Sequence, residues 1–99
     1  MKIPVVQRKE YVLYLERCYG LSFVHCDVFR WNKTTQASLA KDWETICLLH
    51  NEPIYAYHVV GDKKHLKFLQ IYGFTYAFSM RGNDLKEVQI FRKEVPYGN

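Results

Sequence analysis

The stretch that decides the fold runs from residue 54 to residue 93 and reads IYAYHVVGDKKHLKFLQIYGFTYAFSMRGNDLKEVQIFRK. Residues 54–60 are an almost continuous apolar run, which is typical of a strand covered on both faces. Asp62 is placed to cap a helix over Lys63–Tyr72. Gly73 suits the position just after that helix, because glycine tolerates a left-handed backbone.

A β-hairpin is predicted to follow this helix. Phe74–Met80 and Glu87–Lys93 are both rich in strand-forming residues, and residues 81–84 between them are typical of a turn. In the second strand, Val88 and Ile90 share one face, opposite Phe91. The deciding stretch therefore predicts a strand, a short helix and an antiparallel hairpin.

Upstream, residues 35–50 carry the most regular helical pattern of the chain. One stripe of the predicted helix contains Leu39, Trp43, Ile46, Cys47 and His50. Thr34 or Thr35 is suited to cap its start. Pro53 disfavours a helical residue before it and so predicts the end of the helix.

Two segments remain on the N-terminal side. Residues 21–28, LSFVHCDV, are short and β-prone, and predict a strand. Residues 5–19 place apolar side chains at helical spacing, with Pro4 at a suitable entry and Gly20 at a suitable end, and predict a helix.

The whole chain is then predicted to be one α+β domain, residues 1–99, with element order α-β-α-β-α-β-β. The sheet is expected to be mixed and to end in the antiparallel hairpin. Strands 21–28 and 54–60 are joined by a helix, so they are predicted to run parallel through a right-handed crossover.

Composition and charge restrict the partners. The chain is 48% hydrophobic and 16% aromatic, which is ample for a packed core and leaves some rings for an interface. The net charge of +4 permits an acidic partner. The basic residues are dispersed, however, whereas a nucleic-acid binder more often carries a continuous basic stripe. Direct binding to nucleic acid is therefore disfavoured.

Cysteine usage and the apolar runs bear on the compartment. Three cysteines, at positions 18, 26 and 47, are an odd number at wide spacing, which does not suggest a disulfide framework. No apolar run approaches the roughly 20 residues that a membrane-spanning helix needs. The first residues, MKIPVVQRKEY, lack the apolar region of a signal peptide. The sequence thus predicts a cytoplasmic protein.

The stretch from Ile54 to Val95 resembles the last part of the GNAT acetyltransferases, in which a strand, a short helix ending in Gly-Phe and a hairpin follow one another. The run His65-Leu66-Lys67-Phe68-Leu69, with Gly73 behind it, is more similar still to the internal virion proteins of short-tailed phages. This resemblance implies a truncated GNAT-like sheet and a phage-encoded protein. The N-terminal strands that build the acceptor site in the family are expected to be largely missing.

The resemblance also implies where the chemistry of the family would lie. The pyrophosphate loop of the family, Arg/Gln-x-x-Gly-x-Gly/Ala, falls on residues 30–35, which read RWNKTT and contain no glycine. The tyrosine that commonly acts as general acid falls on Leu69, and a common asparagine falls near Gly61. These three departures predict that acetyl-CoA is not a cofactor. Tyr72 is a weak candidate for a displaced catalytic acid.

A candidate partner-binding surface is the loop that contains Phe29, Arg30, Trp31 and Lys33. Cationic and aromatic side chains together are typical of protein-interface hot spots. The same pattern is equally compatible with a loop held by one buried tryptophan.

Histidines and cysteines give no predicted metal site. His25 and Cys26 are neighbours in a strand and point to opposite faces, so at most one of them can join Cys47 and His50. His58 is interpreted as a hydrogen-bonded histidine of the core or its rim, rather than as a catalytic base. His65 begins the last helix, where a capping or packing role is open.

Together these observations predict a small phage protein that acts by protein binding in the host cytoplasm. It would serve virion morphogenesis, or inhibit a host enzyme or defence complex. The partner would be a host or phage protein, or a second copy of the chain. The alternative is an acetyl-CoA-dependent N-acetyltransferase that modifies a host protein, and another is a nucleic-acid-binding module.

Overall fold

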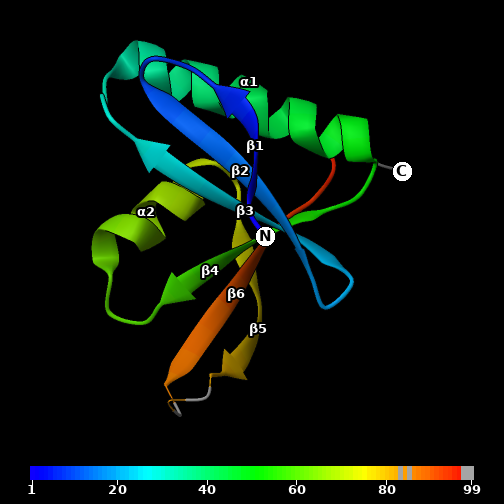
Figure 1. Ribbon diagram of the computed structural model, residues 1–99. Helices are drawn as coiled ribbons and strands as arrows, with labels where there is room; N and C mark the ends of the chain where they lie inside the picture. The colour runs from blue at the N-terminus through cyan, green and yellow to red at the C-terminus, as the bar shows by residue number, and fades with distance from the viewer. Residues whose placement is uncertain (83, 85, 97–99) are drawn as a thin grey trace.

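The computed structural model describes residues 1–82, 84 and 86–96, and within them it shows an α+β fold with the order β-β-β-α-β-α-β-β (Figure 1). The strands are β1 (Ile3–Gln7), β2 (Tyr11–Cys18), β3 (Leu21–Val28), β4 (Ile54–Val59), β5 (Thr75–Arg81) and β6 (Glu87–Lys93). The helices are α1 (Lys33–His50) and α2 (Lys63–Ile71). The described strands form one sheet in the order β1-β2-β3-β4-β6-β5.

The predicted helix over residues 5–19 is wrong, because this segment forms β1 and β2. Tyr11 and Leu13 are fully buried, whereas Val12 and Tyr14 are only partly buried and lie on the other face. This alternation is the period of a strand. Pro4 lies in β1, an edge strand, where proline is tolerated. The expectation that N-terminal strands would be largely missing is wrong for the same reason.

Gly20 ends no helix but belongs to the tight turn between β2 and β3. Cys18 pairs with Leu21, so the loop has only Tyr19 and Gly20, at φ 54° and 73°. Positive φ at both positions is the pattern of a type I′ turn, whose twist matches that of the flanking strands.

The remaining elements are confirmed with small shifts. The strand over residues 21–28 is β3, and its parallel pairing with β4 is present. Helix α1 begins at Lys33, earlier than expected, because Asn32 and not Thr34 or Thr35 caps it. Strands β5 and β6 form the antiparallel hairpin. Its predicted turn, residues 81–84, includes Asn83, which lies outside the described residues.

Both helices contribute to one core on the same face of the sheet. The buried cluster contains Leu39, Trp43 and Ile46 of α1, together with Leu69 of α2. It includes strand residues that alternate onto this face: Tyr11, Leu13, Val24, Ile54, Ala56 and Phe91. In the described part of the chain, neither helix has the length and apolar character needed to cross a membrane.

Candidate functional site

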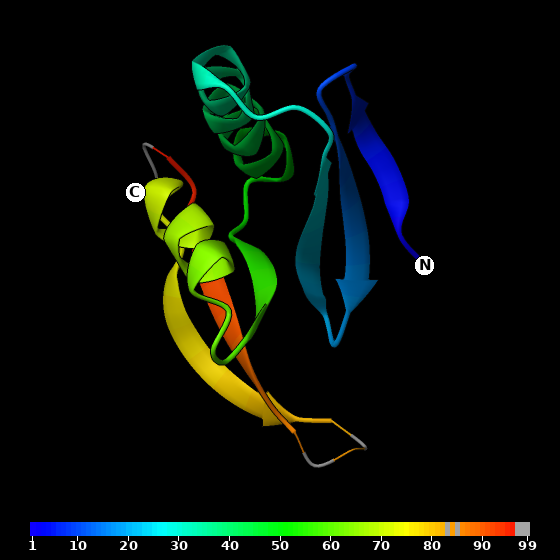
Figure 2. The same cartoon turned by 90° about the vertical axis from the view of Figure 1, so that its left-hand side faces the viewer.

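Strands β3 and β4 pair only at their beginnings. The single registered pair is Phe23 with Tyr55. Beyond it the two strands diverge, and their ends lie apart (Figure 1). Figure 2 shows the consequence for the sheet: β1–β3 and β4–β6 form two groups that separate from each other.

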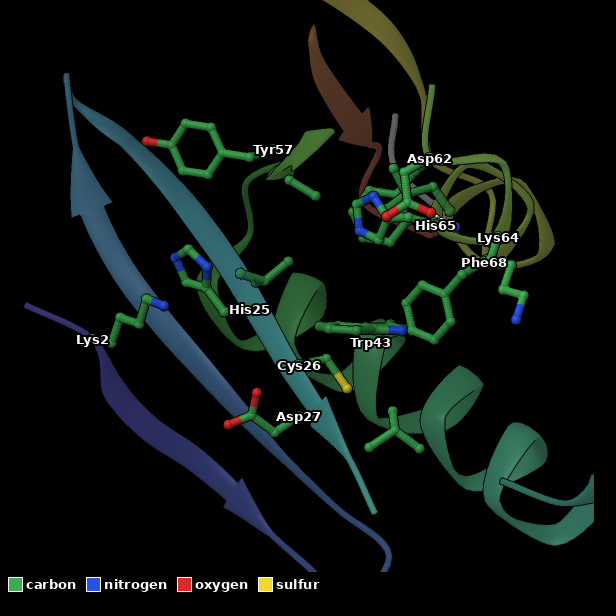
Figure 3. Close-up of a pocket in the computed structure, with 15 residues that line it drawn as sticks. Lys2, His25, Cys26, Asp27, Trp43, Tyr57, Asp62, Lys64, His65 and Phe68 are labelled. Carbon is green, nitrogen blue, oxygen red and sulfur yellow. Dashed lines mark hydrogen bonds between the residues drawn. The ribbon is translucent and has the colours of Figure 1, made fainter. Parts of the chain in front are cut away.

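A cleft of about 600 Å³ occupies this divergence (Figure 3). Its lining has two sides, because neighbouring residues of a strand point to opposite faces of the sheet. On the side of the helices, the lining residues from the core are Val24, Cys26, Trp43, Ala56, Phe68, Leu69 and Phe74. On the opposite side they are Lys2, His25, Asp27 and Tyr57. The cleft is therefore mainly apolar on the helix side, where Asp62, Lys64 and His65 at the start of α2 are polar, and polar on the other side.

The thiol of Cys26 lines the cleft and is therefore a candidate nucleophile, but it stays in its neutral form. Figure 3 shows its sulfur among the cleft residues on the helix side of β3. Burial, assisted by the charge of Asp27, raises the pKa of Cys26 to about 12. A thiolate is the form that attacks or binds metals, so Cys26 acts as a small apolar wall residue at neutral pH.

His25, the neighbour of Cys26, lies on the other face as expected from the strand period. Its Nε2 atom is 3.0 Å from Oε1 of Glu16 on β2. Its hydrogen bond lowers the pKa of Glu16, with the charge of the N-terminus adding to the effect. His25 and Cys26 are thus separated by the sheet, and each meets a different side of the cleft.

A histidine pair lies where β4 leads into α2. The Nδ1 atoms of His58 and His65 are 3.0 Å apart, and the two rings are stacked with centroids 5.2 Å apart. His58 is only 3% exposed, in line with the interpretation of a hydrogen-bonded core histidine. One Nδ1 must donate and the other accept, so the contact requires at least one neutral ring.

The pair also affects the charge of the cleft. His65 lines the cleft, whereas His58 lies behind it in the core. Burial lowers the pKa of His65, and the proximity of His58 lowers it further, while Asp62 opposes the shift. Asp62 also accepts a hydrogen bond of 3.0 Å from the backbone N–H of His65, which confirms Asp62 as the helix cap.

The loop after β3 holds the predicted partner-binding residues at one end of the cleft. The backbone N–H groups of Phe29 and Arg30 donate to the carbonyl oxygen of Glu10, at 2.7 and 3.2 Å. Phe29 is 66% exposed and Trp31 is 47% exposed. Trp31 reaches Phe68, a wall residue of the cleft, with ring centroids 5.9 Å apart. The loop is therefore not held by a fully buried tryptophan.

The N-terminus of α1 is capped by the side chain of Asn32, the residue just before the helix. Oδ1 of Asn32 accepts a hydrogen bond of 2.8 Å from the backbone N–H of Thr35. An anion bound at this helix end would need such backbone N–H groups. Any phosphate here would therefore compete with Asn32 for the N–H of Thr35.

Tyr72, the weak candidate for a displaced acid, is 5% exposed. The hydroxyl donates to the carbonyl oxygen of Gln36 on α1 at 3.1 Å. Burial raises the pKa of Tyr72 to about 12. Tyr72 and Lys33 both line a second, shallower groove between α1 and α2. Lys33 is thus placed on this groove, apart from the cleft lining.

Sequence reasoning missed the cleft and the histidine pair. A signal for the pair was present, because His58 shares a face with the buried Ile54 and Ala56, and His65 lies in the first turn of the next helix. A strand and the helix that follows it commonly pack together. The cleft left no such signal, because it depends on how far β3 and β4 diverge.

Comparisons with known proteins identify the fold. A spermidine N-acetyltransferase chimera of Vibrio cholerae and hSSAT superimposes with a TM-score of 0.69 at 12% identity, over 97% of this chain and 66% of that one. The ribosomal-protein-S5-alanine acetyltransferase of Vibrio fischeri gives 0.65 at 10% identity, over 86% and 54%. No family model and no curated protein matches the sequence.

The chain therefore has the fold of GNAT acetyltransferases and spans between 54% and 66% of the length of these two structures. At such low identity the similarity establishes the fold alone. The position where the resemblance implies a tyrosine acid is Leu69, whose side chain is 2% exposed and belongs to the core.

Proposed function

We propose that this chain is a protein-binding module built on a GNAT-type scaffold, and that it does not transfer acetyl groups. The contact surface is formed by Phe29, Arg30 and Trp31 of the loop after β3, together with Lys33, the first residue of α1. The setting is the host cytoplasm during phage infection, and the partner is a host or phage protein. Binding would assist virion morphogenesis or inhibit a host enzyme or defence complex. The phage setting rests on the resemblance of residues 65–69 alone.

The observation that carries this proposal is the exposure of large aromatic side chains on an ordered loop. Phe29 and Trp31 leave 66% and 47% of their surface accessible, although burial of such rings is strongly favourable. The hydrogen bonds to Glu10 hold the backbone of the loop in place. A held loop loses little entropy when a partner binds, so aromatic contacts there contribute fully to affinity.

Three further observations speak for a scaffold without acetyl transfer. Asn32 occupies a backbone donor at the start of α1. Leu69 fills the position of the family acid with a side chain that has no proton to donate. The hydroxyl of Tyr72 is engaged with Gln36, and its raised pKa makes it a poor source of a tyrosinate.

The first experiment compares partner capture by the loop and by a control surface. The tagged chain is used to isolate partners from infected host cells, with quantitative mass spectrometry as the readout. A protein captured by the wild type is expected to be lost with Trp31→Ala and Phe29→Ala. Leu49→Ala is the matched control, because Leu49 is an exposed apolar residue on α1, at 79%. Equal capture by all four chains would contradict the loop assignment.

Calorimetry with acetyl-CoA tests the second half of the proposal. We expect no heat of binding at micromolar concentrations, because the helix start is capped and the loop has no glycine. Binding in the micromolar range would overturn the non-catalytic assignment.

The cleft itself favours a second candidate, an acetyl-CoA-dependent N-acetyltransferase that modifies a host protein. A cleft of about 600 Å³ that contains His65 is large enough for a ligand and has a titratable group in its wall. This candidate predicts an acetylated protein in infected-cell lysate, with the modification lost on Tyr72→Phe. The absence of any acetylated product would remove this candidate.

A further inference from the structure

We propose that the cleft between β3 and β4 receives an extended segment of the partner, which adds a strand between them. The inference rests on the protein-binding function proposed above and specifies the chemistry of the partner. The segment is expected to alternate apolar and polar side chains over about four or five residues.

The first argument is the state of the strand edges. Strand β3 pairs with β2 along its whole length on one side, and β4 pairs with β6 on its outer side. On their facing sides, β3 and β4 share only the pair of Phe23 with Tyr55. On these sides, residues 24–28 and 56–59 therefore have no strand partner among the described residues, and residues 24–28, 56 and 57 line the cleft. An extended chain supplies the alternating N–H and C=O groups that such edges bind.

The second argument is the difference between the two sides of the cleft. On the side of the helices, the wall is formed mainly by apolar side chains such as Ala56, Phe68 and Phe74. The polar side chains on this side are Asp62, Lys64 and His65, all at the start of α2. On the other side, Lys2 and Asp27 place a cation and a carboxylate at the lining. Successive side chains of an inserted strand point to opposite faces of the sheet. A segment that alternates apolar and polar residues would thus match both sides at once.

The third argument is the continuity of the cleft with the proposed contact loop. Residue Phe29 follows directly on Val28, the last residue of β3, and Val28 lines the cleft. Trp31 touches Phe68 of the cleft wall. A partner held by the exposed rings of the loop therefore has the opening beside it.

The test uses synthetic peptides and amide hydrogen exchange measured by NMR on the full chain. The probes are blocked hexapeptides in which threonine alternates with valine, leucine or phenylalanine, at millimolar concentration. With at least one of them we expect the exchange of amides in residues 24–28 and 56–59 to slow by about tenfold or more. The amides of the β5–β6 hairpin are expected to exchange at an unchanged rate.

Two controls distinguish strand insertion from non-specific binding of the peptide. The same peptide with N-methyl groups on alternate residues keeps the side chains but lacks backbone donors, and is expected to give no protection. Cys26→Leu enlarges a wall residue and is expected to weaken binding about tenfold. Cys18→Leu is the matched control, since Cys18 does not line the cleft, and is expected to bind as the wild type does.

The outcomes distinguish this inference from the function on which it rests. Protection by no peptide, or equal protection by the N-methylated form, overturns strand insertion. Partner capture that depends on Trp31 would still stand in that case. Protection of the same amides by coenzyme A alone would overturn both, because the cleft would then be a cofactor site.

Discussion

At the scale of single residues, Asp42 of α1 accepts three side-chain hydrogen bonds from the N-terminal part of the chain. It accepts hydrogen bonds from Nε and Nη2 of Arg8 at 2.8 and 2.9 Å, and another from the hydroxyl of Tyr11. Burial pushes the pKa of Asp42 upward, but the hydrogen bonds from Arg8 and Tyr11 and the charge of Arg8 outweigh it and hold the pKa below its usual value. The contacts tie α1 to β2 and to the turn before it.

Replacing Asp42 by asparagine is expected to lower the free energy of unfolding by about 2 kcal/mol, because charge-assisted hydrogen bonds to a buried carboxylate are lost. Urea denaturation at pH 7 measures the change. Glu94→Gln is the control, since its pair with Arg92 at 2.7 Å is exposed and is worth less than about 1 kcal/mol. A similar loss in both variants would show that the Asp42 cluster is no stronger than a surface pair.

The lowered pKa of His65 gives a pH dependence with a definite sign. The unfolded chain takes up the proton at a higher pH than the folded chain does. The free energy of unfolding is therefore expected to fall as the pH drops from 7.5 to 5.5. The carboxylates with lowered pKa values, Glu16, Asp42 and Glu52, lose their stabilising effect only at lower pH, from about 4.5 downward.

The slope between pH 7.5 and 5.5 is expected to decrease in His65→Gln, as measured by urea denaturation at three pH values. His50→Gln serves as the control, because His50 is exposed at the end of α1. An unchanged slope in His65→Gln would exclude the histidine pair as the source.

At the scale of elements, the β2–β3 hairpin depends on a turn with an unfavourable residue. Tyr19 adopts φ 54°, which is uncommon for a residue other than glycine, asparagine or aspartate. Tyr19 is 74% exposed, so little packing compensates for the backbone conformation.

Tyr19→Asn is expected to raise the free energy of unfolding by about 0.5 kcal/mol, because Asn-Gly is the favoured pair in this turn type. Gly20→Ala is expected to lower it by about 1 kcal/mol, since Gly20 has φ 73° although a Cβ there would meet no other atom within 4 Å. Thermal denaturation of both variants provides the measurement. A loss of stability in Tyr19→Asn, or a gain in Gly20→Ala, would contradict the assignment of the turn.

At the scale of the whole molecule, α1 holds together two strand groups that share a single registered pair. Trp43 of α1 packs against Phe74 and Tyr72, with ring centroids 5.8 and 6.5 Å apart. The same cluster contains Leu13 and Val24 from the other group of strands. The core, and not the sheet, therefore keeps the cleft at its observed width.

Trp43→Ala is expected to lower the free energy of unfolding by about 3 to 5 kcal/mol, because a large buried side chain is removed. Trp31→Ala is expected to cost less than about 1 kcal/mol, since nearly half of Trp31 is already exposed. Urea denaturation followed by circular dichroism compares the two. A large loss in Trp31→Ala would mean that the loop is part of the core, which would weaken the case for an interface.

Elements whose own sequence pattern reflects their burial were predicted correctly. Features that depend on contacts between distant segments were not. The stripe of α1 and the apolar run of β4 reflect burial that each element shows by itself. In residues 5–19, apolar side chains satisfied both a helical and a strand period, and the helical interpretation was wrong. Pairing with β3 makes residues 11–18 a strand, because every residue of β2 has a partner in β3. For the site, the sequence left open whether residues 29–31 form an exposed surface or are held by a buried tryptophan, and they are exposed. The pairing of His58 with His65 was not foreseen.

The sequence alone determined the α+β class, the strand-helix-hairpin order from Ile54 onward and the absence of glycine between residues 30 and 35. These properties follow from residue types and their spacing along the chain. Only the tertiary structure decided that β3 and β4 diverge after Phe23 and Tyr55, and that the resulting cleft has one mainly apolar and one polar side. The physical reason is that the divergence arises from the packing of Trp43 and Phe74 between distant elements, which no local pattern records.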